Sequence, residues 1–528
     1  MTPRSVMVQG TASSVGKSLV AAALCRIFAR EGLRVAPFKS QNMSNNAAAL
    51  PDGREIGRAQ HLQALAARAE PEAALNTILH KPESDRRSQV VVMGKPWASL
   101  EGADYYARRA ELWDCVQAAY RNLASRFDLV VIEGAGSPAE INLQATDMAN
   151  MAVARLASAP VILVADIDPG GVFAQVVGTL ALLPPEDRSR VKGVVINKFR
   201  GDLELLRPGL AELEERTGVP VLGVIPMLPE LGLPDEDGAA IAASPRAAAQ
   251  GAAAQGAAAQ GEHRLDIAVI KLPHISNFDD FDPLAAEPGV RLRYVQEPRD
   301  LGIPDVVVLP GTKATRSDLA WLWEKGFGDG IRWLSRLGVQ VAGICGGFQM
   351  LGLRVADENG AEGRAGVTQG LGLLDLETFL EGGKIVRPAE GRISLGASGR
   401  LAPLAGLALR GYEIHCGRTG PSPPTAGRGG AETQEFTLLD AVGPSMDGAQ
   451  SPDGGVWGTY LHGIFASDAF RAAWLSSLGG EARVRDAAAQ VDKALDRLAD
   501  AVAASLDIDA LKAVIGMEGK RETQEEEK

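Results

Sequence analysis

The sequence predicts an α/β protein of two domains, each built on a mostly parallel sheet. Short runs of Val, Ile and Leu alternate with helical stretches, which is typical of parallel strands covered by helices on both faces. An Ala/Gly/Gln-rich segment, residues 236–262, interrupts this alternation and contains the unit AAAQG three times. Because the segment has no large apolar side chains to bury, we expect it to be a tether between the domains.

Each predicted domain begins with a buried strand. In the first domain, residues 1–235, we expect helices over 17–31 and 105–125 and strands over 5–9, 34–38, 129–132, 161–165 and 191–197. In the second, residues 263–480, strands are expected over 265–271, 290–295, 306–309 and 339–344. Residues 481–528 form a C-terminal extension, helical over 481–514 and ending in a charged, frayed tail.

Composition excludes several classes of protein. Lys and Arg total 54 against 66 Asp and Glu, a net charge of −12 without a basic stripe, so nucleic acid is not an expected partner. No apolar run reaches the roughly 18 residues of a membrane span, so a membrane is not expected either. The four cysteines are scattered without a CxxC pair, which favours a reducing cytoplasm. Composition leaves the oligomeric state open.

The first motif is GTASSVGKS, which lies between a predicted strand and a predicted helix. Glycines allow backbone N–H groups to approach phosphate oxygens, a lysine reaches the outer phosphates, and a serine hydroxyl holds Mg²⁺. Five residues separate the outer glycines, one more than in the standard P-loop. We therefore predict a P-loop NTPase-like domain that binds ATP through Gly10, Thr11, Val15, Gly16, Lys17 and Ser18.

Polar residues at the ends of other strands extend this site. Glu133 ends a strand beside the loop, where a carboxylate is placed to bind Mg²⁺ together with Ser18. Lys39 is expected to neutralise phosphate or substrate charge, and Glu55 is a weaker candidate for the metal. Asn197 is placed to read the base through its amide, although asparagine is also a common turn residue at a strand end.

The second motif, GICGGFQMLG, predicts a nucleophile elbow with Cys345 at a sharp strand-to-helix turn. The helix N-terminus favours the thiolate, and Gly311 and Gly346 are placed to supply oxyanion N–H groups. A base is required, and two histidines compete for that role. His462 follows an apolar stretch late in the domain and is the preferred base. His415 lies beside a Tyr-Glu pair and could equally be a substrate contact or a core residue.

The lengthened loop resembles that of the dethiobiotin synthetase family, and the Cys elbow, Pro-Gly turn and late His resemble class I glutamine amidotransferases. Together in one chain they resemble the cobyric acid synthase family from residue 6 to about residue 474. The resemblance is carried by GTASSVGKS, PFKSQNMSNN, GREIGRAQ, KPESDRRSQVV, VVIEGAGSPAEINL, VVINKFRGD, LPGTKAT, GICGGFQMLG, GYEIHCG and YLHGIF.

The resemblance implies an activity and its site. The family amidates the b, d, e and g carboxylates of adenosylcobyrinic acid a,c-diamide with ATP, Mg²⁺ and glutamine, and no tightly bound prosthetic group is expected. Cys345 and His462 then form the glutaminase pair. Most class I amidotransferases carry Glu two positions after this His, where this chain has Ile464, so the residue that orients His462 is unassigned and Glu413 is a guess.

Three alternatives compete with this interpretation. A cobyrinic acid a,c-diamide synthase shares both domains and the chemistry but amidates other carboxylates. A partitioning or division-site ATPase would carry a second lysine near the start of the loop and a basic or amphipathic membrane segment, and the sequence has neither. An amidotransferase-like binding module with a dead site would lack the intact Cys345 and His462.

Overall fold

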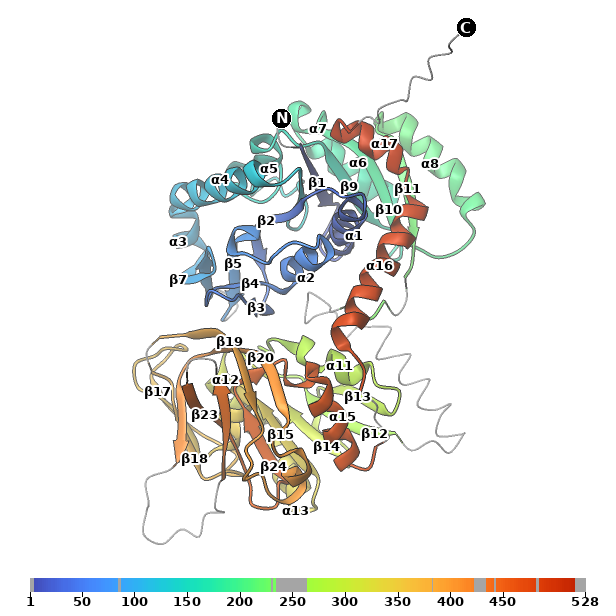
Figure 1. Ribbon diagram of the computed structural model, residues 1–528. Coiled ribbons are helices and arrows are strands. Elements are labelled where there is room, and N and C mark those ends of the chain that lie inside the picture. The colour runs from blue at the N-terminus through green and yellow to red at the C-terminus, as the bar shows by residue number, and fades with distance from the viewer. Residues whose placement is uncertain are drawn as a thin grey trace.

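The computed structural model describes residues 4–83, 87–228, 231–233, 264–381, 383–421, 434–440, 443–480 and 484–517. The predicted tether, 236–262, and the charged tail, 519–528, lie outside these ranges. The described residues form two α/β bodies, drawn in blue to teal and in green to orange in Figure 1. The long helix α16 (Ala487–Ser505) leads from the second body back to the first.

The first body is built on a nine-stranded sheet with the order β11-β10-β9-β1-β8-β2-β5-β6-β7. Its strands from β11 to β5 pair in parallel, whereas β6 and β7 extend the sheet as an antiparallel meander that the sequence pattern did not predict. Strands β3 and β4 form a separate pair. The bounds are β1 (Arg4–Gly10), β2 (Val35–Met43), β3 (Ala47–Ala49), β4 (Glu55–Gly57), β5 (Asn76–Pro82), β6 (Arg87–Val92), β7 (Lys95–Glu101), β8 (Leu129–Glu133), β9 (Val161–Asp166), β10 (Val191–Phe199) and β11 (Val221–Pro226).

Helices cover both faces of this sheet. They are α1 (Lys17–Arg30), α2 (Arg58–Ala66), α3 (Gly102–Ala107), α4 (Arg109–Arg126), α5 (Met151–Leu156), α6 (Val172–Leu182), α7 (Pro185–Arg188) and α8 (Leu203–Thr217). The helix predicted over 105–125 is thus two helices. The C-terminal extension packs here as well: Leu495, Leu498 and Val502 of α16 share a core with α1, and α17 (Ile508–Ile515) adds Leu511.

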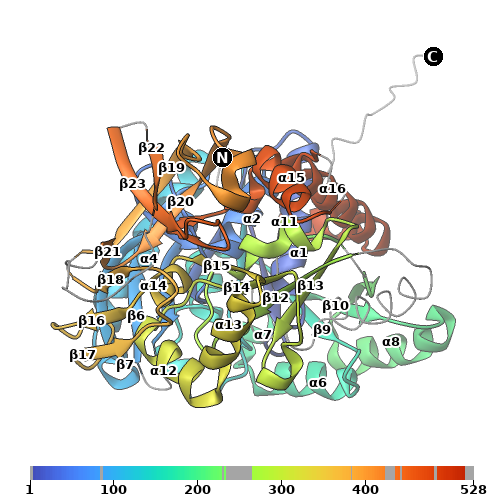
Figure 2. The same cartoon turned by 90° about the horizontal axis from the view of Figure 1, so that it is seen from below.

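The second body has a seven-stranded sheet in the order β13-β12-β14-β15-β24-β23-β22. Its first four strands follow one another from right to left in Figure 2. Strands β13 to β24 are parallel, β23 pairs antiparallel with β24, and β22 pairs antiparallel with β23. The bounds are β12 (Leu265–Ile270), β13 (Val290–Val295), β14 (Val306–Leu309), β15 (Gln340–Ile344), β22 (Gln434–Asp440), β23 (Gly443–Gln450) and β24 (Val456–Thr459).

Smaller sheets and helices complete the second body. One sheet holds β16 (Arg354–Asp357), β17 (Gly366–Gln369), β18 (Leu376–Phe379) and β21 (Arg418–Pro421), and another holds β19 (Ile385–Arg392), β20 (Ala408–His415) and β25 (Leu461–His462). The helices are α11 (Asp282–Ala285), α12 (Thr315–Lys325), α13 (Phe327–Arg336), α14 (Gly346–Leu351) and α15 (Asp468–Ser477), and the 3-10 turn η3 (Phe278–Phe281) precedes α11.

The two bodies meet where β3 and β4 of the first approach β19 and β20 of the second (Figure 1). Ala47, Leu79 and Val91 of the first body form a small apolar cluster with Ile414, and Val386 packs against it. Among the described residues, none of the helices combines the length and the apolar character that crossing a membrane requires. The two bodies are therefore packed directly against each other at this contact.

Candidate functional site

The shape of the loop after β1 depends on Gly16 and on Asn197 of β10. Gly16 has φ +99°, and a Cβ there would lie 2.2 Å from Nδ2 of Asn197, so only glycine fits without a shift. The Asn197 amide donates to the carbonyl of Val15 at 2.8 Å. Asn197 therefore braces the loop, and its role in reading a base stays a prediction.

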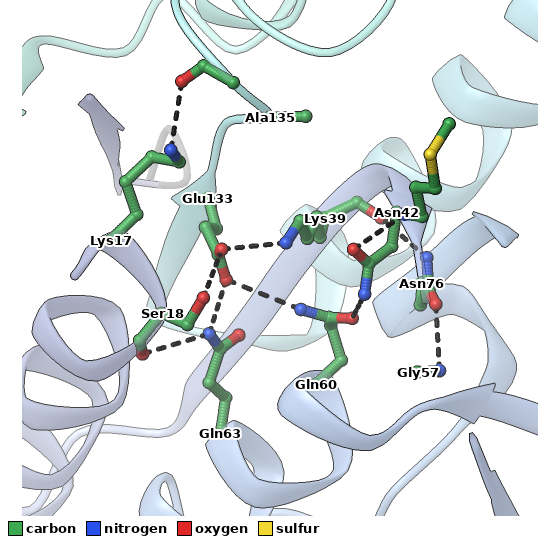
Figure 3. Close-up of polar contacts among 12 residues, drawn as sticks. Lys17, Ser18, Lys39, Asn42, Gly57, Gln60, Gln63, Asn76, Glu133 and Ala135 are labelled. Atoms are coloured by element: carbon green, nitrogen blue, oxygen red, sulfur yellow. Dashed lines mark hydrogen bonds and ion pairs between the residues drawn. The ribbon is translucent and has the colours of Figure 1, made fainter. Parts of the chain in front are cut away.

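Two further predicted residues contact the loop surroundings. Thr11 donates its hydroxyl to Oε1 of Gln175 at 3.1 Å, which ties the start of the loop to α6. Lys17 donates to the carbonyls of Ala12 at 2.8 Å and Gly136 at 3.0 Å, so its ammonium lies between this loop and the one after β8 (Figure 3). With Gly10 at the end of β1, the predicted phosphate-binding residues are together at one sheet edge.

Glu133, at the end of β8, is the centre of a buried polar cluster (Figure 3). Its Oε1 accepts from the Ser18 hydroxyl at 2.7 Å and from the Lys39 ammonium at 2.8 Å. Its Oε2 accepts from the amides of Gln63 at 2.6 Å and Gln60 at 3.4 Å, both on α2. The structure thus brings Ser18, Lys39 and Glu133 into direct contact.

This cluster suits Mg²⁺ bound with a nucleotide. Hydroxyl and carboxylate oxygens are the donors that Mg²⁺ prefers, and it usually takes only one or two protein carboxylates together with substrate phosphates. The Ser18 hydroxyl and one carboxylate oxygen of Glu133, Oε1, lie 2.7 Å apart and provide one oxygen of each kind. No group of three or more His, Cys, Asp or Glu side chains suited to a metal occurs in the described ranges, so the remaining ligands would come from phosphates and water.

Glu55 does not belong to this cluster, and its assignment to the metal is corrected. Its side chain is buried at the contact between the bodies, where Oε2 accepts from the Lys81 ammonium at 2.7 Å and Oε1 from the Lys384 ammonium. The two ammonium groups hold the pKa of Glu55 at about 2 in spite of burial. Both oxygens are therefore engaged in an ion triad that joins the two bodies.

Cys345 lies at a strained turn between β15 and α14, as the elbow motif predicts. Its backbone has φ +54° and ψ −112°, a conformation that costs a non-glycine residue on the order of 1–3 kcal/mol. The thiol is 3.5 Å from the carbonyl of Ile414. The turn places the sulfur at the amino end of α14.

His462 is the histidine that the structure pairs with Cys345, and an unforeseen carboxylate orients it. Its Nδ1 is 2.7 Å from Oδ2 of Asp280, whose Oδ1 accepts from the N–H of Gly463 at 2.7 Å. Burial lowers the pKa of His462, but the charge of Asp280 and interaction with Cys345 outweigh it and raise the pKa to about 10. Asp280 and Cys345 therefore favour the protonated form of His462.

The two other residues considered for this group have different roles. Glu413 lies opposite Arg387 on the neighbouring strand and forms an ion pair with it, so the guess that Glu413 orients His462 is wrong. His415 stacks on Tyr460 with ring centroids 3.7 Å apart, and burial lowers its pKa to about 4. His415 is therefore neutral at physiological pH and is not paired with a carboxylate in the described structure.

A pocket of about 460 Å³ surrounds the sulfur and is walled by both bodies. Its lining includes Asn45 and Lys81 from the first body, and Ser276, Asn277, Thr312, Lys313, Thr315, Cys345, Gly346, Gln349, Glu362, Lys384, Ile414, His415 and Cys416 from the second. Gly346 thus lines the pocket. Gly311 lies behind it, where an added Cβ would come 2.9 Å from Cε1 of His462, so the oxyanion role of both glycines stays a prediction.

Four sets of contacts were not predicted from motifs in the sequence: those of Asp280, of Gln60, of Gln63 and of the lysines around Glu55. One signal for Asp280 was available: SNFDDFDP places adjacent acids between phenylalanines, and acids in an apolar setting are rarely buried without a function or a partner. No local pattern marks Lys384, because its partner Glu55 lies 329 positions away in the sequence.

Comparison with known proteins agrees with this division of the chain. Residues 6–240 match the CobQ/CobB/MinD/ParA nucleotide binding domain, and residues 266–470 match the CobB/CobQ-like glutamine amidotransferase domain. The second match goes against a partitioning or division-site ATPase, for which no amidotransferase half is expected.

Curated relatives match almost from end to end. The cobyric acid synthase of Sorangium cellulosum is 49% identical over 98% of this chain and 100% of its own length. Those of Citrobacter koseri and Moorella thermoacetica are each 47% identical, over 97% and 98% of this chain and 98% of their own lengths. Both halves and their order in one chain are shared with these relatives, and the chain therefore belongs to the cobyric acid synthase family.

Proposed function

We propose that the chain amidates the b, d, e and g carboxylates of adenosylcobyrinic acid a,c-diamide in the cytoplasm, with ATP, Mg²⁺ and glutamine. The observation that carries the proposal is the Cys345 pocket, whose walls come from both the glutaminase body and the ATP-binding body. A glutaminase alone would not require Asn45 and Lys81 beside its nucleophile. The alternative, a cobyrinic acid a,c-diamide synthase, is not favoured because the full-length relatives are cobyric acid synthases.

The glutaminase half begins with the Cys345 thiolate. It attacks the side-chain carbonyl carbon of glutamine, and N–H groups of Gly346 and Gly311 stabilise the oxyanion. His462 then gives its proton to the departing nitrogen, so ammonia leaves and a glutamyl thioester remains, which water hydrolyses to glutamate. Asp280 keeps the imidazole in the orientation that this proton transfer needs.

Glutamine itself is zwitterionic, and the pocket offers both signs of charge. Glu362 lines it near Thr315, whose N–H it accepts at 2.7 Å, and Lys313 and Lys384 provide ammonium groups. Burial raises the pKa of Glu362 to about 7, so an incoming α-ammonium group would favour its charged form. We assign the α-ammonium of glutamine to Glu362 and the α-carboxylate to the lysines.

The ligase half activates the corrinoid carboxylate. A carboxylate oxygen attacks the γ-phosphorus of ATP, ADP leaves, and the resulting acyl phosphate reacts with ammonia to give the amide and phosphate. Lys17 and the loop N–H groups bind the phosphates, and Lys39 neutralises charge beside them. When bound at Ser18 and Glu133, Mg²⁺ would neutralise the charge that develops on the phosphate oxygens.

The experiment compares the wild-type protein with Cys345→Ala, supplying adenosylcobyrinic acid a,c-diamide, ATP and Mg²⁺ with either glutamine or ammonium. Product mass gives the number of amides added. Wild type is expected to use both nitrogen sources and Cys345→Ala only ammonium. A wild-type protein that leaves this corrinoid untouched and amidates cobyrinic acid instead would overturn the assigned substrate.

A further inference from the structure

Helix α2 contacts both the ATP site and the glutaminase body, and the motif GREIGRAQ spans β4 and the first turn of this helix. Gln60 and Gln63 of this helix hold the carboxylate of Glu133 in the ATP-binding body, as Figure 3 shows. Arg58, the first residue of the same helix, faces the glutaminase body instead. The helix has nine residues, so the two sets of contacts are separated by little more than one turn.

Arg58 forms an ion pair across the contact between the bodies. Its Nη2 is 2.7 Å from Oδ2 of Asp279, and the side chains are 24% and 2% exposed. Within the described part of the chain, Asp279 has no other ion pair, and its Oδ1 has no hydrogen-bond partner. Arg58 is therefore the cation that compensates this buried carboxylate.

Asp279 is adjacent in η3 to Asp280, the residue that orients His462. The segment is held at a second point as well: Asn277, with φ +51°, donates to the carbonyl of Ala47 in β3 at 2.7 Å. The same amide donates to the Tyr412 hydroxyl at 2.9 Å, and the Tyr412 ring stacks on His462 with centroids 5.3 Å apart. The ATP-binding body thus holds the segment at Asn277 and at Asp279, the two positions that lie just before the residue that touches His462.

The charges of Arg58, Asp279 and Asp280 connect this contact between the bodies to the glutaminase reaction. Two adjacent buried carboxylates repel each other, and burial together with Asp280 raises the pKa of Asp279, which Arg58 opposes. Without Arg58, the Asp279 carboxylate would be left uncompensated beside the Asp280–His462 pair. The turn would then relax to separate the charges or to reach water, and Asp280 would move with it.

We propose that Arg58 is a positioning residue of the glutaminase site supplied by the ATP-binding body, which fixes Asp280 against His462 by holding Asp279. Glutamine is then hydrolysed at full rate only when the two bodies are docked. This inference rests on the glutaminase role proposed for Cys345 and His462. It also gives the motif GREIGRAQ a function that neither active site alone requires.

The test uses the full chain and the variants R58Q, R58K and R58Q/D279N, with glutamate release and ammonium-dependent amidation measured separately. We expect R58Q to lower the glutaminase kcat by about 2- to 30-fold, the range typical of a coupling residue, with KM for glutamine unchanged. R58K keeps the charge and is expected to fall between R58Q and wild type. R58Q/D279N is expected to regain activity over R58Q, because the uncompensated carboxylate is removed.

A matched control is R155Q, which breaks the Arg155–Asp187 pair inside the ATP-binding body and should leave glutamate release at the wild-type rate. Wild-type glutaminase kcat in both R58Q and R58K would overturn the inference, as would an equal loss of ammonium-dependent amidation. A double variant no better than R58Q would overturn it too. If R58Q does not fold, R58K tests the inference alone: its glutaminase kcat should lie below that of the wild type, and a wild-type kcat would overturn the inference. Absence of glutaminase activity in the wild type would instead refute the proposed function itself.

Discussion

Replacing Asp280 by Asn tests whether this carboxylate sets the proton affinity of His462. The carboxylate accepts from Nδ1 at 2.7 Å and from the Gly463 N–H at 2.7 Å. An amide that keeps its oxygen on Gly463 presents its NH₂ group to Nδ1, which favours the wrong tautomer of the imidazole. We therefore expect the variant to fold and to bind glutamine but to hydrolyse it slowly.

The magnitude follows from the strength of one charged hydrogen bond. Such a bond contributes about 1.5–3 kcal/mol, and one pKa unit corresponds to about 1.36 kcal/mol, so the loss should lower kcat about 10- to 100-fold. By the same conversion the pKa of His462 falls from about 10 to about 8–9. Because the imidazolium is the proton donor, activity is present below this pKa and is lost as pH rises through it.

The assay is the pH profile of glutamate release at saturating glutamine. The basic limb should lie near pH 10 in the wild type and move to about 8–9 in Asp280→Asn. Glu413→Gln serves as the matched control, since Glu413 pairs with Arg387 and should not affect this limb. An unshifted basic limb in Asp280→Asn, or an equal shift in Glu413→Gln, would refute the assignment of Asp280.

Two further variants test the ATP site and the contact between the bodies. Glu133→Gln keeps a hydrogen-bond acceptor for Ser18 but removes the charge for Mg²⁺, so ammonium-dependent amidation should fall by about 100-fold or more, with basal glutamate release retained; loss of both activities would contradict separate sites. Glu55→Gln leaves Lys81 and Lys384 as two buried amines, which should destabilise the protein by about 3–5 kcal/mol. The destabilisation should be larger near pH 6 than near pH 9, because burial lowers the pKa of Lys81 to about 7, and keeping this amine buried without Glu55 costs more stability as the pH falls. Chemical denaturation at both pH values measures it, and an unchanged midpoint at each would contradict the ion triad.

Residues whose function depends on local structure were predictable from the sequence. The glycine-rich loop and the Cys345 elbow each consist of a strand, a tight turn and a helix that are contiguous in the chain. Glu133 was predictable because the carboxyl ends of parallel strands share one edge of a sheet. In these cases the spacing of residues along the chain is enough to predict where the side chains lie.

Contacts between distant segments were not predictable in this way. Asp280 and His462 are hydrogen-bonded although they are 182 positions apart in the sequence, and Arg58 and Glu55 each form an ion pair with a residue of the other body. The guess of Glu413 relied on its closeness in sequence to a histidine, whereas strand pairing gave that carboxylate to Arg387. The strands β6 and β7 were missed because the apolar run of β6 is only three valines long and β7 has no continuous apolar run.

Both bodies line the Cys345 pocket, so we expect ammonia to pass from the glutaminase half to the ligase half inside the protein, and an isotope measurement tests this expectation most directly. Wild-type protein is supplied with adenosylcobyrinic acid a,c-diamide, ATP, Mg²⁺ and glutamine labelled with ¹⁵N in its amide, in a buffer containing unlabelled ammonium. Because the Cys345 pocket is walled by both bodies, we predict that the new amides carry a larger ¹⁵N fraction in the product mass spectrum than the free ammonium does. Label diluted to the isotope ratio of the free ammonium would show that ammonia passes through solution and would contradict the account.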